Sequence, residues 1–139
     1  MPQNLSSQVF AKKIRLKIPF LVTPDMMTQF RSLSGDHHPV HLDPQYARSR
    51  GFRDCIVYGG IMVSQVSRLI GMELPILNCI WTRLTIDFVS PLYVNEEALL
   101  EAHVEGISEA VQVLRLKFRI QVEERLIARG NAEVSFGGK

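Results

Sequence analysis

Apolar and polar residues alternate along several stretches of this 139-residue chain, as strands with one buried face require. The clearest alternation covers residues 114–122, and a similar one lies within residues 10–20. Residues 80–88 also alternate, residues 99–107 form a weaker candidate, and residues 126–136 place small and apolar side chains on one face. The pattern predicts one early strand and about four later antiparallel strands, whose short connections fit a meander.

Between the first strand and the later ones, the apolar residues change to helical spacing. A threonine cap, a first-turn proline and an acid at Thr23-Pro24-Asp25 predict a helix that runs to about residue 33. Asp43-Pro44 predicts a second, short helix in which Asp43 is the N-cap. A third helix, from Gly59-Gly60 to about Met72, is apolar on most sides and is therefore expected to be largely buried.

A long apolar helix needs a cover, and a sheet with one apolar face provides it. An antiparallel sheet that curves around the helix satisfies both elements, which predicts the α+β class. The chain is 46% hydrophobic and 22% charged, as is usual for a globular protein, and its length fits one domain spanning residues 1–139.

Charge and hydropathy argue against several classes of partner. The 16 basic and 14 acidic residues leave a net charge of +2, too small an excess to predict binding to nucleic acid or a membrane surface. No apolar run approaches a membrane span, and the polar start Met1–Ser7 does not resemble a signal peptide, so we expect a cytoplasmic protein. Cys55 and Cys79 lie in apolar surroundings and are expected to be small buried hydrophobes, with a disulfide or a reactive thiol as the alternative.

The segment between the first two predicted helices carries the candidate chemistry. It places Asp36 and His41 five residues apart beside a glycine and a proline, so that a carboxylate and an imidazole can share a water or a substrate proton. Taken alone, this spacing more often marks a loop-capping aspartate and a structural histidine. His37 and His38 add two imidazoles, but no second group of ligands is evident elsewhere, so no metal site is predicted.

The motif Phe30-x-x-Leu33-Ser34-Gly35-Asp36-x-His38-Pro39-Val40-His41-x-Asp43, followed by Ala47, resembles the signature of MaoC-like dehydratases, which include the (R)-specific enoyl-CoA hydratases. The second family element, His-Gly-Met-Leu, aligns with Tyr58-Gly59-Gly60-Ile61. The chain departs from the family at two positions, where His38 replaces the usual asparagine and Tyr58 replaces the usual histidine. A histidine keeps a donor and an acceptor, and a tyrosine keeps a polar tip.

The resemblance implies a hot-dog fold, in which an antiparallel sheet wraps a long helix, and a homodimer or a dimer-based oligomer. It also implies interconversion of trans-2-enoyl and (R)-3-hydroxyacyl thioesters, with Asp36 and His41 as the catalytic pair. The substrate would be carried on coenzyme A or on the phosphopantetheine of an acyl carrier protein, with no cofactor bound by the protein itself. A hot-dog acyl thioesterase and a non-catalytic acyl-thioester binding module are the alternatives.

The first turn of the long helix supplies the other candidate substrate-binding residues. The N–H group of Gly59 or Gly60 is a candidate oxyanion donor, although a glycine there also suits a tight turn or close packing. Ser64 is placed to orient Asp36 or to bond its own helix backbone. Tyr58 is expected to line the acyl pocket or to pack, and His38 to replace some hydrogen bonds of the family asparagine.

Four arginines are candidates for the phosphates of the carrier: Arg48, Arg50, Arg53 and Arg83. A solvated basic face is the alternative.

Overall fold

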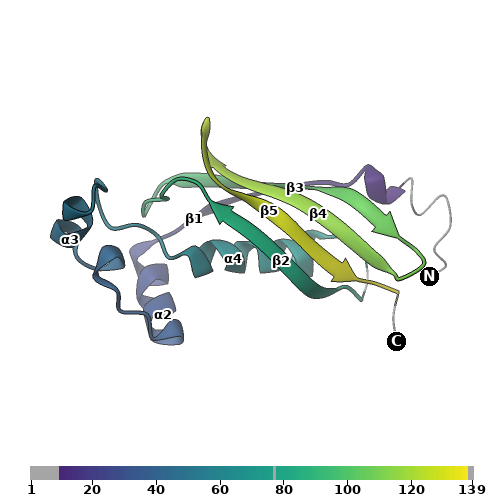
Figure 1. The fold of residues 1–139 in the computed structure, drawn as a ribbon, viewed down its shortest axis with the longest axis horizontal. Helices are drawn as coiled ribbons and strands as arrows, with labels where there is room; N and C mark the ends of the chain where they lie inside the picture. Colours follow the sequence, from purple (N-terminus) through teal and green to yellow (C-terminus); the bar gives the residue numbers. More distant parts are fainter. Residues whose placement is uncertain (1–9, 77, 138–139) are drawn as a thin grey trace.

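The computed structural model describes residues 10–76 and 78–137. Five antiparallel strands form one sheet, and a long helix lies across one of its faces (Figure 1). The strands are β1 (Arg15–Leu21), β2 (Ile80–Phe88), β3 (Glu97–Ser108), β4 (Val113–Val122) and β5 (Arg125–Ser135). The helical segments are α2 (Pro24–Ser34), η1 (Pro39–His41), α3 (Pro44–Ser49), α4 (Gly59–Arg68) and η2 (Leu69–Glu73). The predicted α+β class is confirmed.

The first strand is shorter than the alternation within residues 10–20 predicts. Residues 10–12 are helical, and the amides of Lys13 and Ile14 donate to the carbonyls of Phe10 and Ala11. The strand starts at Arg15, where pairing with β3 begins at His103. The weaker candidate at 99–107 is confirmed as part of β3.

The strand order is β1-β3-β4-β5-β2, so the predicted meander holds only for β3, β4 and β5. Strand β2 pairs with the far side of β5 and forms one edge of the sheet. A side chain on Gly130 of β5 would overlap the carbonyl oxygen of Thr85 in β2, so glycine at this position permits the two backbones to approach.

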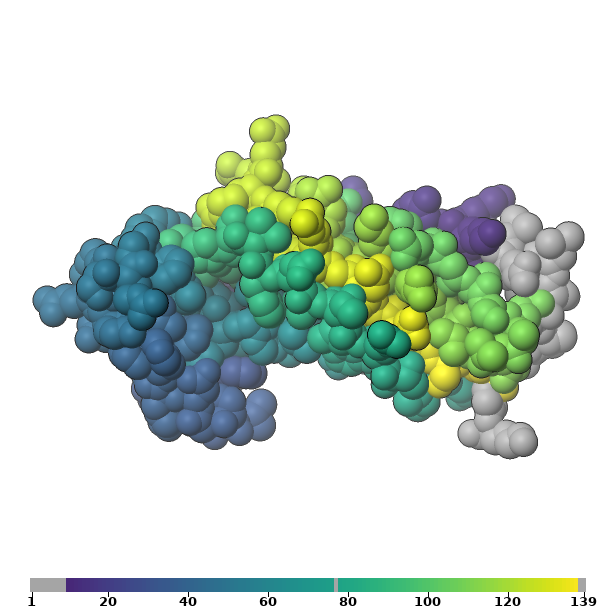
Figure 2. All heavy atoms as spheres, in the orientation of Figure 1, coloured from purple at the N-terminus to yellow at the C-terminus, as the bar shows by residue number. Residues whose placement is uncertain are grey.

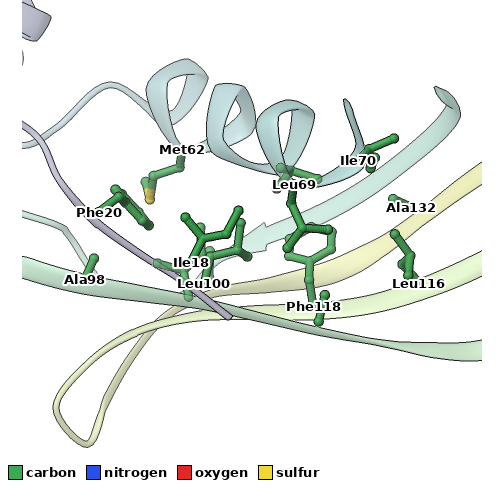
Figure 3. Close-up of a cluster of buried hydrophobic side chains, with 14 of the residues drawn as sticks. Ile18, Phe20, Met62, Leu69, Ile70, Ala98, Leu100, Leu116, Phe118 and Ala132 are labelled. Carbon is green, nitrogen blue, oxygen red and sulfur yellow. The ribbon is translucent and has the colours of Figure 1, made fainter. Parts of the chain in front are cut away.

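The core lies between α4 and the inner face of the sheet. Helix α4 continues without interruption into the π-helical turn η2, and Met62, Leu69 and Ile70 point from this segment toward the sheet (Figure 3). Leu100 and Phe118 meet them from β3 and β4, and all five are buried. Burying each large apolar side chain contributes about 1.5–3 kcal/mol, so this interface orients α4 and its first turn.

Both cysteines are free and half-buried, less buried than the small buried hydrophobes that the sequence predicts, and Cys79 packs against the core. Burial raises the pKa of both thiols, and the neighbouring Asp54 raises that of Cys55 further. In the described ranges, no helix has the length and apolar character needed to cross a membrane.

The helices α2 and α3 form a lobe at one end of the molecule, beside the start of α4 (Figures 1 and 2). The segment between α2 and α3 carries the candidate acid and base, so the fold places them next to the first turn of the long helix.

Candidate active site

The loop after α2 is held by hydrogen bonds between its own neighbouring residues. Gly35 ends α2 in the left-handed conformation (φ 74°), and its amide donates to the carbonyl of Arg31. The Ser34 hydroxyl then accepts from the amide of Asp36 at 3.0 Å, and the Asp36 carboxylate accepts from the amide of His38 at 3.0 Å. Each of these two side chains fixes the backbone two residues further along, so the loop has a defined shape without deep burial.

His38 caps the short helix η1. Its Nδ1 atom accepts from the amide of Val40 at 3.1 Å, and its ring meets Tyr46 edge-on with 5.7 Å between ring centroids. An asparagine oxygen can accept the same bond, so this contact gives a physical reason why histidine is tolerated where the family uses asparagine. His38 is exposed, and the structure gives it this capping role.

His41 is half-buried and held in one orientation. Its Nδ1 atom lies 2.8 Å from the carbonyl oxygen of Ile56, which can only accept a hydrogen bond. The neutral ring therefore carries its proton on Nδ1 and keeps a lone pair on Nε2, as a general base requires. The ring also stacks on Tyr58, with 4.0 Å between centroids and 29° between planes.

Tyr58 joins the loop of the acid to the ring of the base. Its side chain is 1% exposed, and its hydroxyl donates to the backbone carbonyl of Asp36 at 2.7 Å. Burial raises the pKa of Tyr58, the Asp36 carboxylate raises it further, and Arg31 opposes the shift. The phenol therefore stays protonated at neutral pH and keeps this hydrogen bond. Of the two predicted roles, lining the acyl pocket or packing, the structure shows packing, and the contacts with His41 and Asp36 were not predicted.

The Asp36 carboxylate is exposed, and its Oδ1 atom accepts from the amide of His38. Within residues 10–76 and 78–137, no direct hydrogen bond joins the side chains of Asp36 and His41. The Tyr58 ring stacks on the His41 ring, and its hydroxyl binds the backbone carbonyl of Asp36 and not the carboxylate. Tyr58 therefore links the backbone of Asp36 to the side chain of His41.

The two glycines that start α4 differ in their surroundings. A side chain on Gly60 would overlap the ring of Phe30, which makes Gly60 a packing glycine. At Gly59 a Cβ would lie 2.9 Å from the exposed ring of Phe88, and no side chain caps the helix at Tyr58. In the described part of the chain, the amides of Gly59 and Gly60 have no backbone acceptor, and such first-turn donors favour a negatively charged group.

Ser64 does not contact the acid. Its hydroxyl donates to the carbonyl of Ile61, so the structure shows the helix-backbone alternative and not an orienting bond to Asp36. Met72, at the other end of the helical segment, is 77% exposed.

A cavity of about 430 Å³ opens beside His41 and Gly59. Its walls are mostly apolar and include Phe52, Met62 and Phe88, while Asp36 and Tyr58 lie outside the lining. An apolar hollow that meets an oriented imidazole and an uncapped helix start suits an acyl chain whose reactive end is polar. A larger hollow, of about 540 Å³, lies on the outer face of the sheet and contains none of these residues.

The four candidate arginines do not form one cluster. Arg53 is engaged by Glu96, 3.3 Å away, and Arg50 donates to the hydroxyl of Tyr46. Arg48 is exposed on α3, which is part of the lobe, and Arg83 lies on β2. Among the contacts of the described residues, Arg48 is thus the candidate that lies in the lobe and has no bond to its guanidinium.

Comparisons with known proteins agree with this geometry. The model of the MaoC like domain matches residues 6–125. The (R)-specific enoyl-CoA hydratase of Aeromonas caviae is 34% identical over 91 residues, which are 66% of this chain and 68% of the relative. A mitochondrial 3-hydroxyacyl-[acyl-carrier-protein] dehydratase of Arabidopsis thaliana is 31% identical over 88 residues, which are 63% of this chain and 48% of the relative.

Solved structures show the same fold. The (R)-hydratase of A. caviae superposes with a TM-score of 0.82 at 28% identity, covering 88% of this chain and 94% of the other. An R-hydratase of Pseudomonas aeruginosa superposes with a TM-score of 0.80 at 23% identity, covering 91% and 81% of the two chains. The predicted hot-dog architecture is confirmed by these superpositions.

Proposed function

The chain belongs to the MaoC-like domain family and is a hydratase or dehydratase of enoyl and (R)-3-hydroxyacyl thioesters, and we propose that Asp36 and His41 catalyse this reaction. The observation that carries the proposal is the bond from His41 Nδ1 to the Ile56 carbonyl, which leaves Nε2 as a base beside an apolar cavity. A separate question is whether the acyl group is carried on coenzyme A or on an acyl carrier protein.

In the hydration direction, the base removes a proton from a water molecule held between His41 and Asp36. The resulting hydroxide adds to C3 of the enoyl group, and the C2–C3 π electrons move toward the thioester oxygen. The acid–base pair then returns the proton to C2, so that one water has been added across the double bond. Dehydration follows the same steps in reverse.

The developing negative charge on the thioester oxygen needs a donor. Gly59 lines the cavity at the positive end of α4, where a hydrogen bond from its amide to an enolate oxygen would strengthen as charge develops. We assign the donor role to Gly59 and a packing role to Gly60, because Phe30 covers the latter.

One assay separates the proposal from its two alternatives. Purified protein is mixed with a short trans-2-enoyl-CoA, and loss of the conjugated alkene and release of free thiol are followed together. Alkene loss without thiol, with an (R)-3-hydroxyacyl product, supports the proposal. Thiol release indicates a thioesterase, and binding without either change indicates a binding module. Activity that survives in both Asp36→Asn and His41→Ala contradicts the assignment of the pair.

The same assay addresses the carrier. The enoyl group is offered on coenzyme A and on an acyl carrier protein, and the two kcat/KM values are compared. Arg48 is exposed on α3 and is the arginine to neutralise in a test of carrier binding. A rise in KM with unchanged kcat in Arg48→Gln supports contact with the phosphates of the carrier, and an unchanged KM for both carriers argues against it.

We also propose that the chain pairs as a homodimer through the edge strand β2. Ile80, Phe88 and Val89 are 63%, 52% and 50% exposed, although they are large apolar residues at the ends of an unpaired edge. Such an edge favours association with another strand, and a partner there would cover Phe88 at the cavity. Light scattering after size exclusion tests this proposal: a dimer that Ile80→Lys weakens supports it, and a wild-type monomer at micromolar concentration contradicts it.

A further inference from the structure

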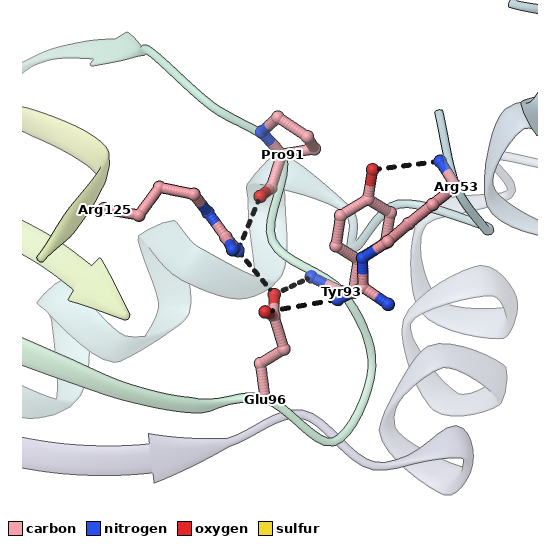
Figure 4. Close-up of polar contacts among 5 residues, drawn as sticks. All are labelled: Arg53, Pro91, Tyr93, Glu96 and Arg125. Atoms are coloured by element: carbon pink, nitrogen blue, oxygen red, sulfur yellow. Dashed lines mark hydrogen bonds and ion pairs between the residues drawn. The ribbon is translucent and has the colours of Figure 1, made fainter. Parts of the chain in front are cut away.

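Glu96 is the centre of an ion-pair network in the turn between β2 and β3. Its carboxylate accepts from the amide of Tyr93 at 2.8 Å and from the Arg125 guanidinium at 2.7 Å, and it lies 3.3 Å from that of Arg53 (Figure 4). The Glu96 side chain is only 15% exposed, and Arg125 also donates to the carbonyl of Pro91. One carboxylate therefore fastens three segments that are distant in sequence.

The segment that contains Arg53 is held at two points. The guanidinium lies 3.9 Å above the ring of Tyr93, and the backbone amide of Arg53 donates to the Tyr93 hydroxyl at 3.2 Å. Glu96 accepts from the amide of the same tyrosine, so both sides of this contact depend on its carboxylate.

This anchoring reaches the candidate base within a few residues. Ile56 forms a β-bridge with Tyr93, and the amide of Val57 donates to the carbonyl of Leu92 at 2.8 Å. The carbonyl of Ile56 is the group that accepts from His41 Nδ1. The strip from Arg53 to Val57 thus carries the only acceptor found for the His41 ring among the described residues, and the turn ending at Glu96 holds that strip in place.

We propose that Glu96 is a positioning residue: by clamping Arg53 and Tyr93, it holds the Ile56 carbonyl that fixes the tautomer and orientation of His41. The inference rests on the proposed role of His41 as the base. It adds a residue 55 positions away in sequence, on a different part of the fold, to the set that determines the reaction.

The charge of Glu96 is essential to this role. Burial by itself raises the pKa of Glu96, but the hydrogen bonds from Arg125 and the Tyr93 amide, with the charges of both arginines, lower it overall. Glu96 is therefore ionised throughout the pH range in which an imidazole titrates. In Glu96→Gln, one amide oxygen replaces a carboxylate that serves three donors, and Arg53 and Arg125 lose their shared counter-charge.

The test reads His41 directly and needs no substrate. The protein contains four histidines, so ¹⁵N-histidine labelling gives a spectrum in which tautomer and pKa of each ring are resolved, with His41→Ala assigning the signal. Kinetics with a short enoyl-CoA are measured in parallel. Glu133→Gln is the matched control, because it removes another Arg–Glu pair (3.1 Å, with Arg115) from the sheet, away from the site.

We expect wild-type His41 to show the Nδ1–H tautomer, and Glu96→Gln to show a mixture of tautomers. The value of kcat should fall roughly 10- to 100-fold in Glu96→Gln, as misplacement of a catalytic group does, with KM little changed. Glu96→Asp should recover part of the loss, and Glu133→Gln should match the wild type.

A folded Glu96→Gln protein whose His41 signals and kcat equal those of the wild type overturns the proposal. If Glu96→Gln does not fold, Arg53→Gln decides, because it removes the Arg53 side of the same clamp and the Arg53 side chain is 63% exposed. Unchanged His41 signals in Arg53→Gln then overturn the proposal. Absence of hydratase activity in the wild type contradicts the proposed function. The histidine spectra still report whether Glu96 orients His41, so the two failures are distinguishable.

Discussion

Removal of one hydroxyl from Tyr58 tests how the acid and the base are coupled. Tyr58→Phe keeps the ring that stacks on His41 at 4.0 Å and packs at a tilt against Phe30 at 4.8 Å between ring centroids, and it deletes only the bond to the Asp36 carbonyl. The substitution therefore frees the loop of the acid while the base stays in place.

The magnitude follows from the surroundings of the lost bond. A buried carbonyl left without a donor costs about 1–3 kcal/mol. Asp36 is exposed, so water can reach its carbonyl, and the free energy of unfolding should fall by only about 1 kcal/mol, the low end of that range. By contrast, Tyr58→Ala removes a ring that is 1% exposed and should cost about 3–5 kcal/mol, as other buried aromatic truncations do.

The effect on catalysis should be larger than the effect on stability suggests. If the loop moves when its tether is cut, the carboxylate loses its alignment with His41, and kcat should fall roughly ten-fold while KM changes little. Urea denaturation and the enoyl-CoA assay measure the two effects on the same samples.

Tyr46→Phe is the matched control, since it deletes an exposed tyrosine hydroxyl that bonds only Arg50 among the described contacts. A Tyr58→Phe protein with wild-type kcat refutes the coupling through Tyr58, whatever its stability. A large loss of stability with unchanged kcat would show that the hydroxyl is purely structural.

Three further outcomes follow from the site. Gly60→Ala should lower the free energy of unfolding by about 1–3 kcal/mol because the new methyl group meets the ring of Phe30. In Gly59→Ala the new methyl group meets the far end of the exposed Phe88 ring, so this variant should mainly lower turnover. Urea titration and steady-state kinetics distinguish the two variants, and equal losses of stability would contradict this expectation. Ser64→Ala should leave kcat unchanged, because the hydroxyl bonds the helix backbone; a ten-fold loss in steady-state assays would instead restore an orienting role. Because the pKa of Glu96 is lowered in the fold, its ionised form stabilises the protein above the unfolded pKa of about 4.5, and this contribution is lost as the pH falls through the lower folded pKa. The difference in urea midpoint between the wild type and Glu96→Gln should therefore be constant at neutral pH and shrink below about pH 4.5. A difference that stays constant at all pH values would refute this expectation.

Periodicity predicted the elements well because their faces are unequally buried. The run at 114–122 became β4 with every second residue buried, and the apolar helix became α4 and η2 against the sheet. The order of the strands was not predictable in the same way. Nothing in the spacing of β2 indicates that it lies beside β5, since that pairing depends on the space left by Gly130.

The sequence named candidate residues for the site, but not the contacts that hold them. Spacing and resemblance named Asp36 and His41, whereas the group that orients His41 is a backbone carbonyl, at Ile56, which every residue type carries. The role of Glu96 could not be predicted either, because in the sequence an acidic residue after Asn95 is typical of a solvated turn. Only the structure shows that two arginines distant in sequence contact it. Tertiary contacts of this kind leave no local pattern in the sequence.

The two departures from the family motif have physical explanations in the same loop. His38 supplies the acceptor that an asparagine would supply to the Val40 amide, and Tyr58 supplies a hydroxyl that reaches the Asp36 carbonyl. Histidine at position 38 therefore keeps the bond that an asparagine would make, and the Tyr58 hydroxyl binds the backbone of Asp36, so neither departure replaces Asp36 or His41. Because the Ile56 carbonyl still holds His41 in one tautomer beside an apolar cavity, neither departure favours a binding module over an enzyme.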